Sequence, residues 1–430
     1  MDDPRRLVPR TDAVLADPRL TGEAQRLGAG RVKTAVAAAL ARCRAGELSP
    51  DDVVSHALDS LHAGAGGLRP VINATGVVVH TNLGRAPLSE AAREALLLAA
   101  GATDIEIDLA TGQRGRRGRS ALAALGRAVP DAEDVLVVNN GAAALSLVAH
   151  ALAWQQEIVV ARGELVEIGD GFRIPDLLEA SGAQLREVGT TNRVRLDDYA
   201  AAITASTALV LKVHPSNFVV AGFTASVGVS ELATLPVPLV VDIGSGLLAP
   251  HSRLPDEPDA GSTLRAGAAL VTASGDKLLG GPQGGLVLGR SDLVQRMRRH
   301  PVARALRVDK LTLAALEATL DGPPSPVAEA LGSVQDGLLA RAGAIRDDLA
   351  DLVAADAVPT KAVVGGGGAP GVELASAAVA LPATLAGRLR TGQPAVLGHV
   401  AKGRLLLDLI AVDPSYDASI VDAVRLAVEE

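Results

Sequence analysis

Between Val71 and about Leu320 the chain alternates short runs of β-forming residues with longer helical stretches, and this alternation constrains the fold more than any other feature. The runs are "DVLVV" before "GAAALSLVAHALAW", "EIVVA" before "IPDLLEASG", and "AQLREV" before "LDDYAAAI", followed by "ALVLKV" and "PLVVDIG". Strands that alternate with helices form βαβ units, whose strands lie parallel in one sheet. We therefore predict an α/β protein with a mostly parallel sheet.

The chain, at 430 residues, is long enough for two or three domains. Residues 1–66 are predicted to form a helical domain, because "GRVKTAVAAALARCRAG" spaces its apolar residues at helical intervals. "HAGAGGLRP" is typical of a linker, and residues 67–320 hold the alternating pattern. Residues 321–430 are predicted to form a smaller α/β domain, with a long helical segment after "DGPPSP" and strands near "KAVV" and "RLLLDL". "VVGGGGAPG" is predicted to be a loop.

Composition narrows the class of protein. A single cysteine, Cys43, excludes a disulfide framework and fits a reducing compartment. No run of about 18 apolar residues occurs, so we expect a soluble, cytoplasmic protein without a membrane segment.

The formal charge of −8 hides two basic clusters. The first 44 residues hold nine Lys or Arg against five acids, and "RGRRGR" at 114–119 holds four arginines. Each cluster is either a solvated surface or a contact for phosphate or nucleic acid.

"VTASGDKLLGGPQGG", residues 271–285, places Lys277 between a predicted strand ending "ALVTA" and a second strand, "GGLVLG". A lysine crowded at a strand end can lose enough pKa to be nucleophilic and form a Schiff base with a carbonyl cofactor such as pyridoxal phosphate. The alternative is a lysine that caps the sheet edge through a salt bridge to Asp276. This stretch alone does not separate the two hypotheses.

Residues at the ends of other strands favour the hypothesis of a pyridoxal phosphate site over that of a salt bridge. Ligands of open parallel sheets collect at the carboxyl ends of strands. After "VLVV", the turn of Asn140, Gly141 and Ala142 opens a helix whose N–H groups can hold a phosphate. Asp242 ends another strand and can pair with a pyridinium nitrogen, and the Ser274 hydroxyl can reach the phosphate. Each feature alone is an ordinary turn or loop cap, but their order predicts a fold-type I pyridoxal phosphate enzyme; the residue that stacks on the cofactor ring is not identified.

The amino-acid sequence of several longer runs, spread over nearly the whole chain, resembles that of the bacterial selenocysteine synthase family, also called L-seryl-tRNA selenium transferase. These runs are "VINATGVVVHTNLGRAPLS", "RGELVEIGDGFRIPD", "EVGTTNRVRLDDY", "LKVHPSN", "AGFTASV", "SGDKLLGGPQGG" and "RALRVDKLTLAALEATL". The resemblance implies a homo-oligomer, a ring of dimers and typically a decamer. It also implies conversion of serine on selenocysteine tRNA into selenocysteine with selenophosphate.

The resemblance also implies roles for single residues. Lys277 is similar to the family's cofactor-attaching lysine, Asp276 to its neighbouring acid, and His214 of "LKVHPSN" to a cofactor-binding residue. Three arginines resemble those that bind the selenophosphate oxyanion: Arg85, Arg304 and Arg307. Salt bridges within the fold are the alternative for these arginines. No metal site is predicted.

Other functions stay open at this point. The nearest alternative is a related pyridoxal phosphate lyase acting on a small amino-sugar phosphate or amino acid. Such lyases lack the N-terminal domain, so its presence here, in residues 1–66, favours a tRNA-binding domain. A cysteine desulfurase needs a nucleophilic cysteine near the cofactor, and the chain has only Cys43 in its N-terminal region. A tRNA-binding scaffold without chemistry would not need Ser274, Asp276 and Lys277 together.

Overall fold

The computed structural model describes residues 8–62, 68–169 and 171–429. These residues fall into two compact units, residues 1–72 with 387–396, and residues 73–386 with 397–430. None of the described helices is both long and apolar enough to cross a membrane. The predicted division into three domains at residues 66 and 320 stays a prediction.

The first unit is built around a small bundle of helices: α1 (Thr11–Leu15), α2 (Pro18–Leu27), α3 (Ala29–Arg44), the 3₁₀ turn η2 (Pro50–Asp52) and α4 (Val53–His62). Asp17 caps α2 by accepting a hydrogen bond from the Arg19 N–H at 2.9 Å. Leu20, Val36 and Leu40 are fully buried between the helices. The predicted helical region is therefore confirmed within the described residues, while most of the predicted linker lies outside them. Strands β1 (Val71–Asn73) and β14 (Ala395–Leu397) form a two-stranded sheet.

The second unit contains a seven-stranded sheet with the strand order β3-β11-β10-β9-β8-β4-β7. Its strands are β3 (Asp134–Val138), β4 (Glu157–Ala161), β7 (Gln184–Val188), β8 (Thr207–Val213), β9 (Leu239–Gly244), β10 (Leu270–Ser274) and β11 (Gly285–Gly289). Only β11 runs antiparallel to its neighbours. The predicted strands and the mostly parallel sheet are confirmed.

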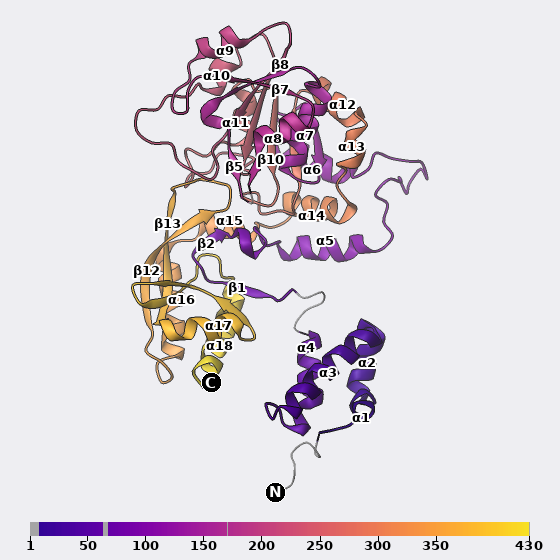
Figure 1. Ribbon diagram of the computed structural model, residues 1–430, viewed down its shortest axis with the longest axis vertical. Helices are drawn as coiled ribbons and strands as arrows, with labels where there is room; N and C mark the ends of the chain where they lie inside the picture. Colours follow the sequence, from indigo (N-terminus) through magenta and orange to yellow (C-terminus); the bar gives the residue numbers. More distant parts are fainter. Residues whose placement is uncertain (1–7, 63–67, 170, 430) are drawn as a thin grey trace. The chain divides into compact units, whose positions relative to one another are not determined.

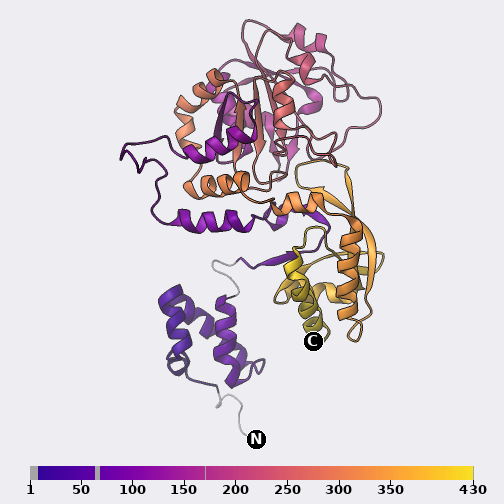
Figure 2. The same ribbon diagram turned by 180° about the vertical axis from the view of Figure 1, so that it is seen from behind.

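Helices cover both faces of this sheet, as the two opposite views show (Figures 1 and 2). One face packs against α7 (Gly141–Leu152), α8 (Ile174–Ala180) and α12 (Ser291–Arg299). The other packs against α6 (Arg119–Ala128), α9 (Leu196–Ala202), α10 (Val229–Leu232), α11 (Ala260–Arg265) and α14 (Lys310–Asp321). Because side chains alternate along a strand, Val240 and Asp242 of β9 face the α7 side, whereas Val241 faces the α11 side.

A second sheet of five strands has the order β15-β16-β13-β12-β2. Its strands are β2 (Val77–Val79), β12 (Asp356–Gly365), β13 (Glu373–Pro382), β15 (His399–Ala401) and β16 (Arg404–Asp408), and helices α16 (Gln335–Asp348) and α18 (Asp417–Glu429) belong to the same region. The hairpin of β12 and β13 carries the glycine-rich loop at its tip.

The remaining elements are short or connecting: η4 (Thr81–Leu83), α5 (Glu90–Ala100), η5 (Arg162–Glu164), β5 (Glu167–Ile168), β6 (Phe172–Arg173), α13 (Val302–Ala305), α15 (Pro326–Gly332), η6 (Ala383–Leu385), α17 (Ala386–Thr391) and η7 (Pro414–Tyr416). The prediction of one long helical segment after "DGPPSP" is wrong in one respect. The segment forms two helices, α15 and α16, which Ser333 and Val334 separate. Strand β13 was not predicted, since its alanine-rich sequence, "ELASAAVALP", favours helix locally and forms a strand through burial.

Candidate active site

Lys277 lies in the turn after β10, and its amine is enclosed by backbone. A Cβ added at Gly367 would lie 2.7 Å from the Lys277 Nζ, and one added at Gly244 would lie 3.9 Å from it. Burial lowers the pKa of Lys277, Asp242 opposes this shift, and the positive charge of Arg85 adds to it. Enclosure and a lowered pKa are the conditions that a nucleophilic lysine needs, and they agree with the prediction made for Lys277.

Asp242 lies near the carboxyl end of β9 and is buried. Its Oδ1 accepts a hydrogen bond from the Thr272 hydroxyl on β10 at 2.8 Å. Burial raises the pKa of Asp242, and the Thr272 hydrogen bond and the charge of Lys277 work in the opposite direction. A buried carboxylate of this kind is stabilised by a protonated ring nitrogen placed against it.

The turn after β3 meets the end of β10. Asn140 is the N-cap of α7, and its side chain accepts a hydrogen bond from the Ala143 N–H at 2.8 Å. A Cβ added at Gly141 would lie only 2.7 Å from the Ser274 Oγ. The helix N-terminus and the serine hydroxyl therefore converge, and the first N–H groups of α7, those of Gly141 and Ala142, have no partner within the helix. Such an arrangement is typical of a phosphate site, and the sequence predicts a phosphate here.

Buried polar atoms without protein partners fit a polar ligand at this place. Among the described residues, the Ser245 Oγ and the Glu257 Oε1 are buried and have no hydrogen-bond partner. Ser245 adjoins the lysine turn, since its carbonyl oxygen accepts a hydrogen bond from the Leu278 N–H at 2.8 Å. His214 follows β8; its N–H donates to the Asp242 carbonyl oxygen at 2.9 Å, and its Nε2 lies 3.2 Å from the Glu257 Oε2. The residues present thus fit pyridoxal phosphate.

Arg85 and Asp276 form an ion pair next to Lys277. The Arg85 Nη1 lies 2.7 Å from the Asp276 Oδ2, and the Ala86 N–H donates to the Asp276 carbonyl oxygen at 3.2 Å. Arg85 has a left-handed backbone, with φ of 68°, which costs free energy in a residue other than glycine. The structure thus joins Arg85 to the lysine turn across 191 residues of sequence.

Of the other two predicted arginines, Arg307 lies at the carboxyl end of β3 and Arg304 lies on α13. Arg307 forms a backbone bridge with Val138, and its Nη1 lies 3.6 Å from the Glu106 Oε1. Arg304, on α13, is exposed and has no side-chain partner among the described residues. Arg85 is joined to Lys277 through Asp276, whereas no described contact joins Arg304 or Arg307 to the lysine turn.

Each arginine of the basic cluster 114–119 has an acidic partner within the fold. Arg114 and Arg117 contact Glu106, Arg116 lies 3.6 Å from Asp134, and Arg119 lies 3.4 Å from Asp104. This favours a structural role for the cluster over phosphate contact.

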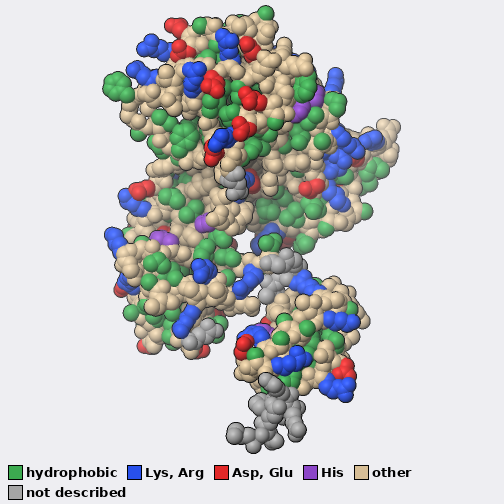
Figure 3. Space-filling model, viewed as in Figure 1, with side chains coloured by type: hydrophobic (Ala, Val, Ile, Leu, Met, Phe, Trp, Pro, Cys, Tyr) green, Lys and Arg blue, Asp and Glu red, His purple; other side chains and the backbone are tan. Residues whose placement is uncertain are grey.

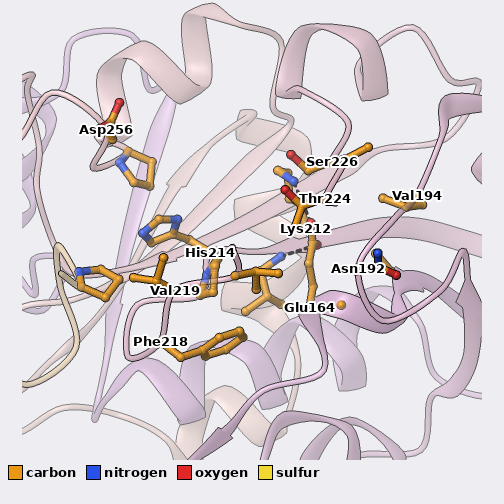
Figure 4. A pocket seen from close by; sticks show the side chains of 18 of the residues that line it. Glu164, Asn192, Val194, Lys212, His214, Phe218, Val219, Thr224, Ser226 and Asp256 are labelled. Carbon is orange, nitrogen blue, oxygen red and sulfur yellow. Dashed lines mark hydrogen bonds and ion pairs between the residues drawn. The ribbon is translucent and has the colours of Figure 1, made fainter. Parts of the chain in front are cut away.

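A cavity of about 550 Å³ adjoins the site (Figure 4). Its lining includes His214 and Glu257, but it also contains Val241, which faces away from Asp242, and it does not include Lys277. In Figure 4 the Lys212 and Glu164 side chains meet at one wall, where the Lys212 Nζ lies 2.7 Å from the Glu164 Oε1. The chemistry around Lys277 identifies the candidate active site better than the size of this cavity does.

Comparison with known proteins decides the family. Residues 71–413 match the family described as L-seryl-tRNA selenium transferase. The chain belongs to this family. Residues 5–44 also match the family described as selenocysteine synthase N terminal.

Two curated relatives are named L-seryl-tRNA(Sec) selenium transferase. The protein from Moorella thermoacetica is 45% identical over 392 residues, which cover 85% of this chain and 83% of the relative. The protein from Hyphomonas neptunium is 40% identical, with 98% of each chain covered. The family resemblance stated from the sequence is therefore confirmed.

A solved structure of a D-glucosaminate-6-phosphate ammonia-lyase has a TM-score of 0.59 and 20% identity, and covers 84% of this chain and 96% of its own. At this identity the likeness shows the fold alone. This likeness confirms the predicted fold class. Membership of the family confirms the predicted pyridoxal phosphate cofactor.

Sequence reasoning missed three residues near Lys277: Ser245, Glu257 and Gly367. Ser245 directly follows the strand-end stretch "PLVVDIG", where it could have been found, whereas Glu257 stands in a stretch without a motif. The four glycines 365–368 were interpreted as an ordinary loop, although consecutive glycines also signal close approach of backbone to a neighbouring group.

Replacing Lys277 by alanine should abolish covalent attachment of pyridoxal phosphate. Borohydride reduction of the protein with bound cofactor should leave a stable adduct on the peptide that contains Lys277, measured by mass spectrometry. Lys402→Ala removes an exposed lysine and should retain the adduct. A reduced adduct on any residue of the Lys277→Ala protein would contradict the assignment.

Proposed function

We propose that this protein converts serine esterified to a selenocysteine tRNA into selenocysteine, with pyridoxal phosphate as cofactor and selenophosphate as selenium donor. The observation that carries the proposal is the position of Lys277, a buried amine surrounded by Asp242, the Ser274–Gly141 contact and the Arg85–Asp276 pair. The relatives' names supply the substrate, since they are called L-seryl-tRNA(Sec) selenium transferases. Selenophosphate as the donor is what the family resemblance implies, and three arginines that suit an anionic donor agree with it.

When bound, pyridoxal phosphate supplies a carbonyl for attachment and a ring that accepts electrons from the α-carbon of an amino acid. Lys277 supplies the amine for attachment and, once free, the base that removes the α-proton of the seryl group. Asp242 is the group that holds a proton on the ring nitrogen. The leaving hydroxyl takes the proton that Lys277 has removed and departs as water, while Asp276, ionised in its pair with Arg85, stabilises the protonated form of Lys277.

Arg85 has a double role in this proposal. Its Nη1 contacts Asp276, so it orients the acid, while its other N–H groups remain for the anionic donor. A guanidinium suits a phosphate-like anion because it donates two parallel hydrogen bonds. Arg304 and Arg307 complete the donor site in the proposal, and binding of the donor at Arg307 competes with its contact to Glu106.

Residues 1–66, predicted from the sequence to be a tRNA-binding domain, are the proposed tRNA contact. Four of their basic residues pair with local acids: Arg10, Arg19, Arg26 and Arg42. Lys33 and Arg44 are exposed on α3 without a described partner, and at eleven residues apart they lie on the same face of the helix. Figure 3 shows Lys and Arg side chains next to Asp and Glu over these helices.

We also expect a homo-oligomer, with a ring of dimers, typically a decamer, implied by the resemblance. Large apolar side chains that a second copy could cover support association: Leu97, Leu98 and Leu109 are each at least 75% exposed.

The reaction itself is the first test. Purified protein with seryl-tRNA(Sec), selenophosphate and pyridoxal phosphate should release selenocysteinyl-tRNA, detected by selenium in the aminoacyl product. Absence of product, together with turnover of a small amino-sugar phosphate or free amino acid, would move the assignment to a lyase.

Alanine at Arg85, Arg304 or Arg307 should raise the KM for selenophosphate, because each loses a charge-assisted contact of about 1.5–3 kcal/mol. Cofactor absorbance should persist in all three. Arg299→Ala, which removes an exposed arginine of α12, is the matched control. Unchanged donor dependence in all three variants would make these arginines structural.

Joint replacement of Lys33 and Arg44 by alanine should weaken binding of the tRNA without changing cofactor binding. Each lost phosphate contact should make the dependence of log K on log salt shallower by about one unit. Affinity is measured over a series of salt concentrations, with Arg19→Ala as control because Arg19 pairs with Asp17. Equal affinity and equal salt slope would place the tRNA contact elsewhere.

A further inference from the structure

Glu257 lies between the two sheets of the second unit, in the segment before α11, and is 7% exposed. Its Oε2 is shared by two groups. The Nε2 of His214, after β8, lies 3.2 Å away, and the Ala369 N–H, in the loop between β12 and β13, donates to it at 2.7 Å. One buried carboxylate oxygen therefore connects the end of the seven-stranded sheet to the glycine-rich loop of the five-stranded sheet.

The loop that Glu257 holds lies directly on Lys277. A Cβ added at Gly367 would be 2.7 Å from the Lys277 Nζ and Cε, and one at Gly366 would be 2.3 Å from the Thr81 Oγ1. A Cβ at Gly368 would be 3.0 Å from Leu278. Three successive glycines thus bring bare backbone against the lysine turn and against the segment that leads to Arg85.

The loop conformation requires an external contact. Ala369 has φ of 45°, a left-handed conformation that an alanine adopts at a cost in free energy. The hydrogen bond from its N–H to a buried carboxylate is charge-assisted and offsets this cost. The contact that stabilises the loop is therefore the one made by Glu257.

We propose that Glu257 is a positioning residue: its buried carboxylate holds the loop 365–371 and His214 together, so that the loop backbone covers Lys277 and excludes water from its amine. The inference rests on the proposed role of Lys277 as the reactive amine. It adds a residue that acts on that amine through the loop.

Glu257 acts on the pKa of Lys277 in two ways that have opposite signs, and this makes the proposal testable. Covering the amine lowers the pKa of Lys277, whereas the negative charge of Glu257 raises it. The other charged groups that act on the amine are Asp242, Arg85 and Asp276, and they stay in place in the variants below. If the loop is released, the pKa of Lys277 rises; if only the charge is lost, the pKa falls.

The experiment measures the pH dependence of Lys277 acetylation in full-length protein stripped of cofactor, by mass spectrometry. Glu257→Ala should move the midpoint upward by about one pH unit or more, toward the value of about 10.4 for an exposed lysine. Glu257→Gln retains an oxygen that can accept from the Ala369 N–H, so its midpoint should stay or fall. A midpoint that falls in Glu257→Ala as well would overturn the proposal, because the charge alone would then explain the residue.

Gly367→Ala tests the same loop from its other side and leaves the Glu257–His214 contact intact. Its Cβ meets Lys277, so it should displace the loop and raise the midpoint as Glu257→Ala does. Glu164→Ala is the matched control, since Glu164 is equally buried, at 7% exposed, and contacts Lys212 rather than the loop. An unchanged midpoint in Gly367→Ala would also overturn the proposal. Because no tRNA or selenium donor is used, failure here is distinct from failure of the proposed function.

Discussion

The site depends on the close packing of backbone around the amine of Lys277. A lysine that loses water without gaining a tight ion pair is held closer to its neutral form, and Lys277 meets glycine backbone on two sides. Asp242, Asp276 and Glu257 lie near enough to act on its charge, yet none forms a salt bridge with it in the described structure. The amine therefore remains available for a carbonyl group.

This enclosure needs both sheets. The parallel strands β9 and β10 end at the same edge and bring Asp242 and Ser274 to the lysine turn. The five-stranded sheet adds a hairpin loop whose glycines allow contact closer than any Cβ would permit. The parallel sheet thus contributes the polar side chains of the site, and the second sheet contributes the loop that covers the amine of Lys277.

Some charged residues form ion pairs within the fold, and others have no described partner. The arginines of the cluster 114–119 and four basic residues of the first unit contact nearby acids, so their positive charge is neutralised locally. Arg304, Lys33 and Arg44 are exposed without a described partner. The unpaired cations are the better candidates for anionic ligands, and composition alone does not separate the two groups.

The sequence by itself determined the alternating strands and helices, the helical first unit, the family and the strand-end residues Asn140, Asp242, Ser274 and Lys277. These features follow from local periodicity and from motifs that are contiguous in the chain. Only the tertiary structure decided that Arg85 contacts Asp276, that β13 is a strand despite its alanines, and that Glu257 connects His214 to the loop over Lys277. Such contacts join residues that are far apart in sequence. They form where packed elements bury backbone and carboxylates together, and no local sequence pattern encodes that packing.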